Sequence, residues 1–137
     1  MFSTKHATPI LLLALLLAGC STNVGKTIQV SGAQLAQYDS MSKTEAVAAL
    51  ELRLAKERSA KLPFLAPHYY AEAQELFIAL QTAPENTPKN VWVADIAKAH
   101  TLLDKGGSVS AQVRERFPRE LELKGLLDQF NANESYP

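Results

Sequence analysis

The chain has one cysteine among 137 residues, Cys20, and lacks the residue patterns that mark common enzyme classes. A single thiol has no disulfide partner within the chain, which excludes a fold stabilised by internal disulfide bonds. The sequence also has no Gly-x-Ser-x-Gly turn, no Gly-rich phosphate loop, and no His-x-x-x-His or Glu-x-x-His pair. We therefore expect a protein that is not an enzyme and that needs no cofactor.

An excess of charge of either sign is missing as well. Lysine and arginine together number 14, and aspartate and glutamate also number 14. A near-neutral chain is a poor fit to nucleic acid, and it does not dock electrostatically on anionic lipid. Strand signals are equally scarce: only the alternating residues 27–30 resemble one, and without partner strands we interpret them as extended linker.

The N-terminus, in contrast, carries a strong pattern. Lys5 precedes an unbroken apolar run from Ile10 to Ala18, which leads into Leu17-Ala18-Gly19-Cys20. As a helix the apolar run would extend about 14 Å, roughly half of a ~30 Å hydrocarbon core, so a membrane span is not expected. This order of features is that of a secretory signal.

The Leu-Ala-Gly-Cys motif resembles the lipobox of bacterial lipoproteins. The resemblance implies removal of residues 1–19, a diacylglycerol on the sulfur of Cys20, and a fatty acid such as palmitate on its new amino group. Two or more acyl chains hold a protein stably on a membrane, so the rest of the chain need not bind lipid. Ser21, where an aspartate would favour retention in the inner membrane, implies the outer membrane with the chain facing the periplasm. A Gram-positive origin would instead place the same domain outside the plasma membrane.

Loss of His6 with the signal leaves His68 and His100 as the only histidines. A two-histidine metal site stays open, but no carboxylate lies at a supporting helical offset from both, which favours structural histidines and no metal. We divide the remaining chain into residues 20–41 as lipidated cysteine and tether, 42–131 as a helical domain, and 132–137 as a C-terminal tail.

The helical domain begins with a capping box, Ser42 with Glu45. Apolar residues at helical spacing then predict a first helix that ends before Pro63, with Glu57 and Lys61 on its solvent side. A second helix is predicted from Pro67 to near Pro84. The stripes that carry these two predictions are Val47, Leu50 and Leu54, then Tyr69, Ala73, Leu76 and Leu80, widened by Tyr70 and Phe77.

A third helix is predicted to start with Thr87 as its cap and to end at Gly106-Gly107, where glycine would adopt the left-handed conformation. Ser108 or Ser110 would cap a fourth, which Pro118 should kink or split. Their stripes are Trp92, Ile96, Ala99 and Leu103, then Val113 and Phe117, then Leu123, Leu126, Leu127 and Phe130. The fold class is therefore all-α, a small antiparallel bundle of about four helices.

Two groups of residues are candidate contacts for a protein partner. Tyr69 and Tyr70 open the second helix, where one ring could face the core and the other a partner, although packing of both rings with Phe77 is the favoured alternative. Arg114, Arg116 and Arg119 form a basic patch around Pro118 that could meet carboxylates, or could simply be a solvated face.

The run from Leu65 to Ala73 resembles the small helical domain that precedes OmpA-like domains in some outer-membrane lipoproteins. An OmpA-like domain itself is absent from this sequence, so the helical module works alone or the sequence is a fragment. The resemblance implies a lipid-anchored envelope protein that holds or organises a protein partner. Two alternatives stay open. A pilotin-like carrier of a secretin or other outer-membrane subunit should display an apolar groove between helices, and a lipid- or hydrophobe-binding module should enclose an apolar cavity.

Overall fold

The computed structural model describes residues 28–134, with side chains through residue 132. In this range the chain forms six helices and no strand, which confirms the all-α prediction. No helix among these residues is both long enough and apolar enough to span a bilayer. The signal sequence, Cys20, Ser21 and the last three residues lie outside the described residues.

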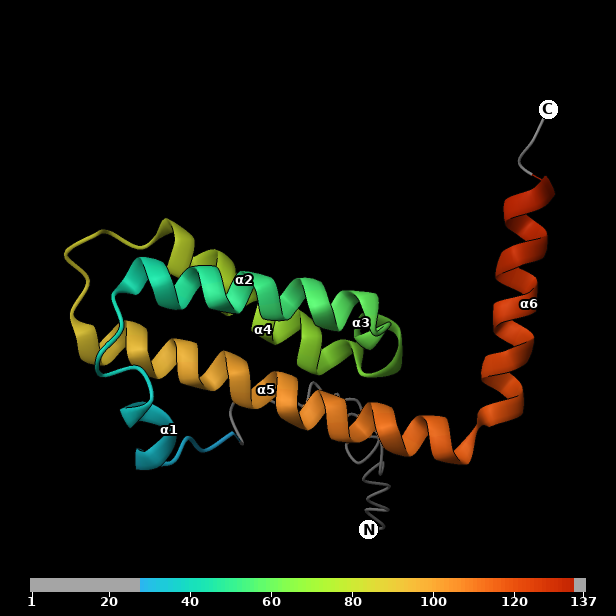
Figure 1. The fold of residues 1–137 in the computed structure, drawn as a ribbon, viewed down its shortest axis with the longest axis horizontal. Coiled ribbons are helices and arrows are strands. Elements are labelled where there is room, and N and C mark those ends of the chain that lie inside the picture. The colour runs from blue at the N-terminus through green and yellow to red at the C-terminus, as the bar shows by residue number, and fades with distance from the viewer. Residues whose placement is uncertain (1–27, 135–137) are drawn as a thin grey trace, which may run out of the picture.

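Three long helices form the bundle: α2 (Lys43–Ser59), α4 (Pro67–Thr82) and α5 (Lys89–Arg116). Each lies against the other two, and α4 runs antiparallel to α2 and α5 (Figure 1). A one-turn helix, α3 (Leu62–Leu65), connects α2 to α4 at one end of the bundle. The antiparallel bundle is thus confirmed, with three long helices in it rather than four.

The predicted stripes of these three helices form the core. Leu50, Ala73, Ile96 and Leu103 are completely buried, and Trp92 is nearly so. Burying a large apolar side chain stabilises a fold by ~1.5–3 kcal/mol relative to leaving it in water. Other members of the stripes, such as Val47, Tyr69, Leu76 and Phe77, are partly buried and pack against this core.

The predicted start is correct for α2 and α4 but not for α5. The Ser42 hydroxyl accepts from the backbone N–H of Glu45, and the Glu45 carboxylate accepts from the backbone N–H of Ser42 at 2.9 Å. The backbone N–H of Ser42, and then its hydroxyl, which also donates to the Glu45 carboxylate, lower the pKa of Glu45. Pro67 is the first residue of α4, as predicted. Thr87, however, does not cap α5: its hydroxyl donates to the carbonyl of Pro84, and α5 begins after Pro88.

The predicted helix end at Gly106-Gly107 is wrong. Helix α5 continues through both glycines to Arg116, neither glycine has a positive φ, and Ser108 and Ser110 lie inside the helix. The reason for Gly106 is packing: a Cβ there would stand 3.0 Å from the Cβ of Tyr69. Glycine therefore allows α4 to approach α5 closely, a need that sequence alone does not distinguish from a helix end.

Pro118 does split the last helical segment. Phe117 ends α5, and α6 (Pro118–Glu134) turns away from the bundle (Figure 1). The expected fourth stripe consequently does not enter the core, because Leu123, Leu126, Leu127 and Phe130 are all more than half exposed.

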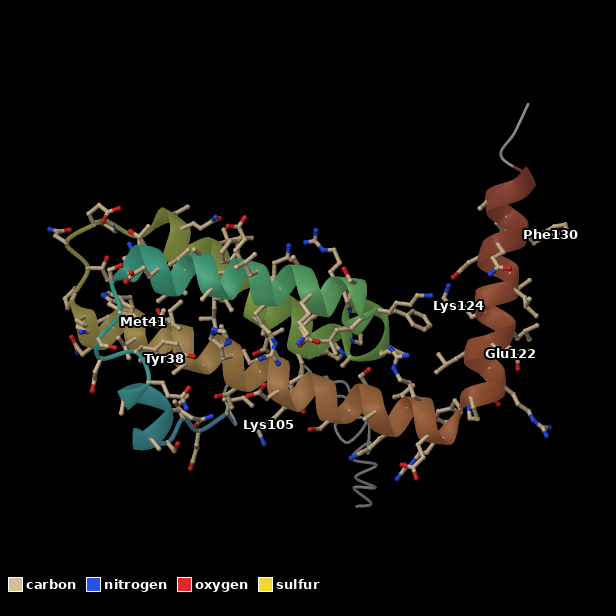
Figure 2. The ribbon with its side chains drawn as sticks, viewed as in Figure 1. Tyr38, Met41, Lys105, Glu122, Lys124 and Phe130 are labelled. Atoms are coloured by element: carbon tan, nitrogen blue, oxygen red, sulfur yellow. The ribbon has the colours of Figure 1, made fainter. Side chains whose placement is uncertain are left out.

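The tether prediction fails for residues 28–41. A short helix, α1 (Gly32–Ala36), begins at a capping box of Ser31 with Gln34 and lies beside α5. The Gln34 amide donates to the Thr101 hydroxyl at 3.0 Å. Ile28 and Leu35 pack against the core, as do Tyr38 and Met41, which are labelled in Figure 2. The packed part of the chain therefore begins at least fourteen residues before the predicted boundary at Ser42, since residue 28 is already in contact with it.

Candidate functional site

A groove of about 290 Å³ lies between α3 and α6, at the end of the bundle where α5 gives way to α6. Figure 2 shows Lys124 extending from α6 across this gap toward the bundle. The residues that line the groove come from the α2–α3 connection, α3, the last turns of α5, and α6: Lys61, Phe64, Leu65, Arg114, Leu121, Lys124, Gly125 and Asp128.

Local backbone chemistry positions the α3 side of the groove. Helix α2 ends at Ser59, and Lys61 adopts a left-handed conformation with φ 62°, which turns the chain sharply into α3. Within α3, Leu62 and Leu65 are buried and fix the short helix to the core. Phe64 then points outward, and its side chain is about half exposed, 52%. An aromatic ring is thereby presented to the groove from a rigid support.

The α6 side depends on Pro118, which lacks a backbone donor and so cannot continue α5. The turn at Phe117 and Pro118 places α6 opposite α3. Lys124 bridges the two sides: its ammonium lies 5.0 Å from the centroid of the Phe64 ring and 2.8 Å from both carboxylate oxygens of Asp128. A cation over an aromatic face contributes ~0.5–1 kcal/mol at an exposed site.

The rim of the groove is positively charged. Lys61, Arg114 and Lys124 face a single acidic residue, Asp128, and Asp128 is already paired with Lys124. Arg114 donates to the carbonyl of Ala60 at 2.7 Å and has no acidic partner in the part of the chain that the structure describes. Lys61 has no ion-pair partner among the described residues. An apolar floor of Phe64, Leu65 and Leu121 under a cationic rim suits an apolar side chain next to a carboxylate.

The structure buries one of the two predicted tyrosine contacts and partly buries the other. Tyr70 is buried; its hydroxyl accepts from Nε of Arg58 at 3.1 Å and donates to the carbonyl of Leu54 at 3.5 Å. Tyr69 is partly buried and packs against the core beside Gly106. The prediction that Tyr70 contacts a partner is therefore wrong, because both the ring and its polar group are already used inside the bundle.

The three predicted arginines do not act together. Arg114 lines the groove, whereas Arg116 and Arg119 are exposed and do not line it. Three further lining residues were not predicted as contacts from the sequence: Lys61, Phe64 and Lys124. The spacing of Lys124 and Asp128 at i and i+4 does predict an ion pair, but only the tertiary turn at Pro118 brings that pair to Phe64.

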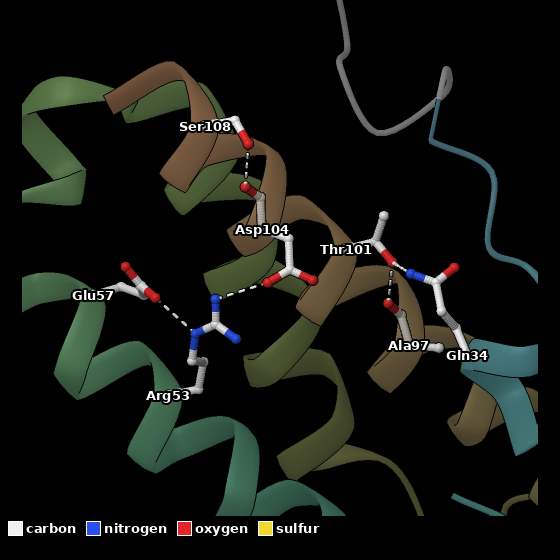
Figure 3. Close-up of polar contacts among 7 residues, drawn as sticks. All are labelled: Gln34, Arg53, Glu57, Ala97, Thr101, Asp104 and Ser108. Carbon is white, nitrogen blue, oxygen red and sulfur yellow. Dashed lines mark hydrogen bonds and ion pairs between the residues drawn. The ribbon is translucent and has the colours of Figure 1, made fainter. Parts of the chain in front are cut away.

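A second polar cluster ties α2 to α5. Nε of Arg53 lies 2.7 Å from Glu57, and its Nη2 lies 2.9 Å from Asp104 (Figure 3). Burial lowers the pKa of Arg53, but the hydrogen bonds to Glu57 and Asp104 more than offset it and raise the pKa overall. Glu57 is mostly covered, so the prediction that it lies on the solvent side is wrong; Lys61 lies beyond the end of the helix.

The two histidines have different surroundings. His68 is exposed at the start of α4, whereas the ring of His100 stacks on Tyr38 with centroids 5.8 Å apart. Burial lowers the pKa of His100, and the nearby positive charge of Arg53 lowers it further. Its Nε2 is buried and has no hydrogen-bond partner among residues 28–134. Across residues 28–134 no three histidine, cysteine, aspartate or glutamate side chains gather into a group that could hold a metal ion.

No protein family matches the sequence, and no match to the chain was found among curated proteins or solved structures.

Proposed function

We propose that the protein is a non-enzymatic, lipid-anchored envelope protein that faces the periplasm and holds or organises a protein partner at the outer membrane. The observation that carries the proposal is the groove between α3 and α6, with its apolar floor and cationic rim. Burying apolar surface gives affinity, and uncompensated cations at the rim favour partners that bring a carboxylate.

The lipid anchor would keep this groove near the membrane. Acylation at Cys20 follows from the lipobox resemblance, and the packed part of the chain already includes Ile28. Eight residues span at most about 30 Å when fully extended. The point where Ile28 packs against the core would therefore lie within that distance of the membrane surface.

A pilotin-like carrier is the second candidate, and the same groove favours it. A carrier has to cover an apolar segment of an outer-membrane subunit during transit, and the exposed ring of Phe64 offers a contact of that kind. Binding of a free hydrophobe is the weaker candidate, because it calls for an enclosed apolar cavity and this groove has a charged rim.

Crosslinking in intact envelopes, followed by affinity capture and identification of the bound protein, tests the groove. We expect Phe64→Ala combined with Lys61→Glu to lose the crosslinked partner, because floor and rim are both altered. The matched control is Arg119→Glu, a charge reversal on an exposed residue that does not line the groove. Equal capture by all three proteins, with unchanged melting temperatures, would contradict a partner site in the groove.

Replacing Cys20 with serine tests the anchor and separates the two candidates. We expect no incorporation of labelled fatty acid and loss of membrane attachment. If the protein is a holder, its partner should stay in the outer membrane of the Cys20→Ser strain while its organisation changes. If it is a carrier, the partner should itself fail to reach that membrane. Fatty-acid label persisting in Cys20→Ser would refute the anchor.

A further inference from the structure

The segment of residues 28–41 lies on α5 with little buried surface. Its apolar residues that contact the core are only partly buried, and no residue of α1 is fully buried. Two polar contacts add to them: the Gln34 amide donates to the Thr101 hydroxyl (Figure 3), and the Lys89 ammonium donates to the backbone carbonyl of Asp39. A segment with few buried contacts opens at a lower free energy than the core of the same protein. This segment can therefore separate from α5 without unfolding of the three long helices.

A histidine lies under this segment. The ring of Tyr38 stacks on the ring of His100 in α5, with centroids 5.8 Å apart and 22° between the ring planes. The Nε2 atom of His100 is buried and has no hydrogen-bond partner among the residues that the structure describes. Protonation makes both nitrogens of a histidine ring donors, so a protonated His100 would bury an N–H without an acceptor. Burial of an unpartnered donor is unfavourable, and more so when the group is charged. The packed segment therefore fits the neutral ring better than the charged one.

The charges near the ring add to this preference. Burial is the largest cause of the lowered pKa of His100, and the positive charge of Arg53 on α2 is the second. Asp104, one turn along α5, acts in the opposite direction, but its carboxylate already binds Arg53 at 2.9 Å. Glu57 binds the same guanidinium at 2.7 Å. Arg53 and Asp104 also act on the Tyr38 hydroxyl, whose pKa is raised, chiefly by burial.

The other elements packed on α5 carry their charged groups away from this ring. Helices α1 and α3 contain no titratable residue. Glu72 and Glu75 of α4 lie beside Lys98, which is two positions from His100 and so about 200° around the helix axis. Asp39 lies beside the first residue of α5, about 16 Å along the axis from His100. Among residues 28–134, the charges that bear on the ring are thus those of α2 and of α5 itself.

We propose that protonation of His100 releases the segment of residues 28–41 from α5 while α2, α4 and α5 stay packed together. Release lets water accept the Nε2 hydrogen, and water also weakens the repulsion from Arg53. The packed form has the lowered pKa, and the released ring returns to the ordinary value of 6.5. The released form therefore takes up the proton more readily. The equilibrium shifts toward release as the pH falls below 6.5, by at most about tenfold per pH unit for one proton.

Release would lengthen the connection between the membrane and the bundle. With the segment packed, Ile28 is eight positions after Cys20; after release, the first packed residue is at the start of α2, and Ser42 is 22 positions after Cys20. The fully extended lengths of these two connections are at most about 30 Å and about 75 Å. This consequence rests on the proposed lipid anchor, whereas the release itself does not.

Hydrogen exchange of the full-length protein, measured by mass spectrometry above and below pH 6.5, tests the release. Five backbone amides of the segment are hydrogen-bonded within it, those of residues 34, 35, 38, 39 and 41. A helix as short as α1 is not stable without support, so release exposes these amides to exchange. After correction for the intrinsic pH dependence of exchange, we expect their protection to fall by up to about tenfold per pH unit below 6.5. Protection in α2 and α5 should not change. An equal fall in those helices would mean that the whole bundle unfolds, and would overturn the proposal.

Substitution of each histidine identifies the group that takes up the proton. His100→Gln should remove the pH dependence of protection in the segment, because glutamine does not titrate in this range. The matched control is His68→Gln, which replaces an exposed histidine at the start of α4 and should keep the full pH dependence. The same loss of protection in His100→Gln as in the unsubstituted protein would overturn the proposal.

A further pair of variants keeps the result separate from folding and from the anchor. Arg53→Gln leaves His100 in place and should reduce the loss of protection at low pH, because a protonated ring is easier to accommodate without this cation. Cys20→Ser should lose membrane attachment but keep the release, so failure of the anchor does not count against the release. An undiminished loss of protection in Arg53→Gln would contradict the role of the charges around His100 and overturn the proposal.

Discussion

Helices α5 and α6 carry apolar residues at the same helical spacing, but their stripes meet opposite surroundings. In α5, Ile96 and Leu103 are completely buried, whereas in α6 every member of the stripe is at least 53% exposed. Periodicity therefore establishes that a helix has an apolar face. It does not establish that the chain's own core covers that face.

The cause of the difference is the position of each helix in the bundle. Helix α5 lies against α1, α2, α3 and α4, so its apolar residues are covered from several sides. Pro118 ends that arrangement, because it removes a backbone donor where α5 would otherwise continue. Helix α6 then contacts the bundle mainly at the end of α5 and across the groove.

The largest expected effect is a direct test of this comparison. Ile96→Ala should lower the free energy of unfolding by ~2–5 kcal/mol, because it leaves a cavity in the core. Leu126→Ala should cost well under ~1 kcal/mol in a monomer, because the side chain is already largely exposed. Leu76→Ala should fall between them, since Leu76 is only partly buried. Urea denaturation of the three variants at low protein concentration provides the measurement. Equal losses for Ile96→Ala and Leu126→Ala would show that α6 packs into the core.

A smaller effect is expected at the paired glycines of α5. Gly106→Ala should lower stability by ~1–3 kcal/mol, because the new Cβ would meet the Cβ of Tyr69 at 3.0 Å, and that atom is held by the α4 backbone. Gly107→Ala should raise stability by ~0.5–1 kcal/mol, because nothing lies within 4 Å and alanine favours helix. Thermal melting of both variants measures whether each substitution raises or lowers stability. A destabilised Gly107→Ala would indicate that the helix does end there.

These glycines show which parts of the fold are readable in the sequence. Capping boxes and apolar stripes are local, and they correctly predict the start of α2, the start of α4 and most of the core. The length of α5 depends on how closely α4 approaches it, which is a tertiary fact. Two adjacent glycines followed by serines fit both a helix end and a close approach, and the sequence does not separate the two.

The candidate site was harder to predict for the same reason. Arg114 could be named from the basic patch, and it does line the groove. Tyr70 could not be assigned, because the sequence does not show that Arg58 and the Leu54 carbonyl bind its hydroxyl inside the bundle. Phe64 and Lys124 come within cation–π distance only through the turn at Pro118. None of these partners lies near the other along the chain.

The smallest expected effect concerns the segment of residues 28–41. This segment packs against α5 and the core, whereas the apolar stripe of α6 does not. Tyr38 from this segment stacks on His100, whose Nε2 is buried without a partner. Burial, and then Arg53, lower the pKa of His100 below its usual 6.5, so the unfolded chain takes up a proton at a higher pH than the folded chain. The contribution of His100 to stability is therefore fully present above pH 6.5 and is lost as the pH falls through the lowered pKa.

We expect the free energy of unfolding to fall as the pH drops below 6.5, and His100→Gln to reduce that fall. Urea denaturation at several pH values measures the slope. Glu45→Gln is a control with a different window, because the pKa of Glu45 is lowered from 4.5 and its contribution is lost only at more acidic pH. Glu45→Gln should therefore leave the pH dependence of the free energy of unfolding near pH 6 unchanged. An unchanged pH dependence in His100→Gln would contradict the prediction. It would mean that the His100 ring takes up protons as readily in the folded protein as in the unfolded chain, and that the packing of Tyr38 over it does not persist in solution.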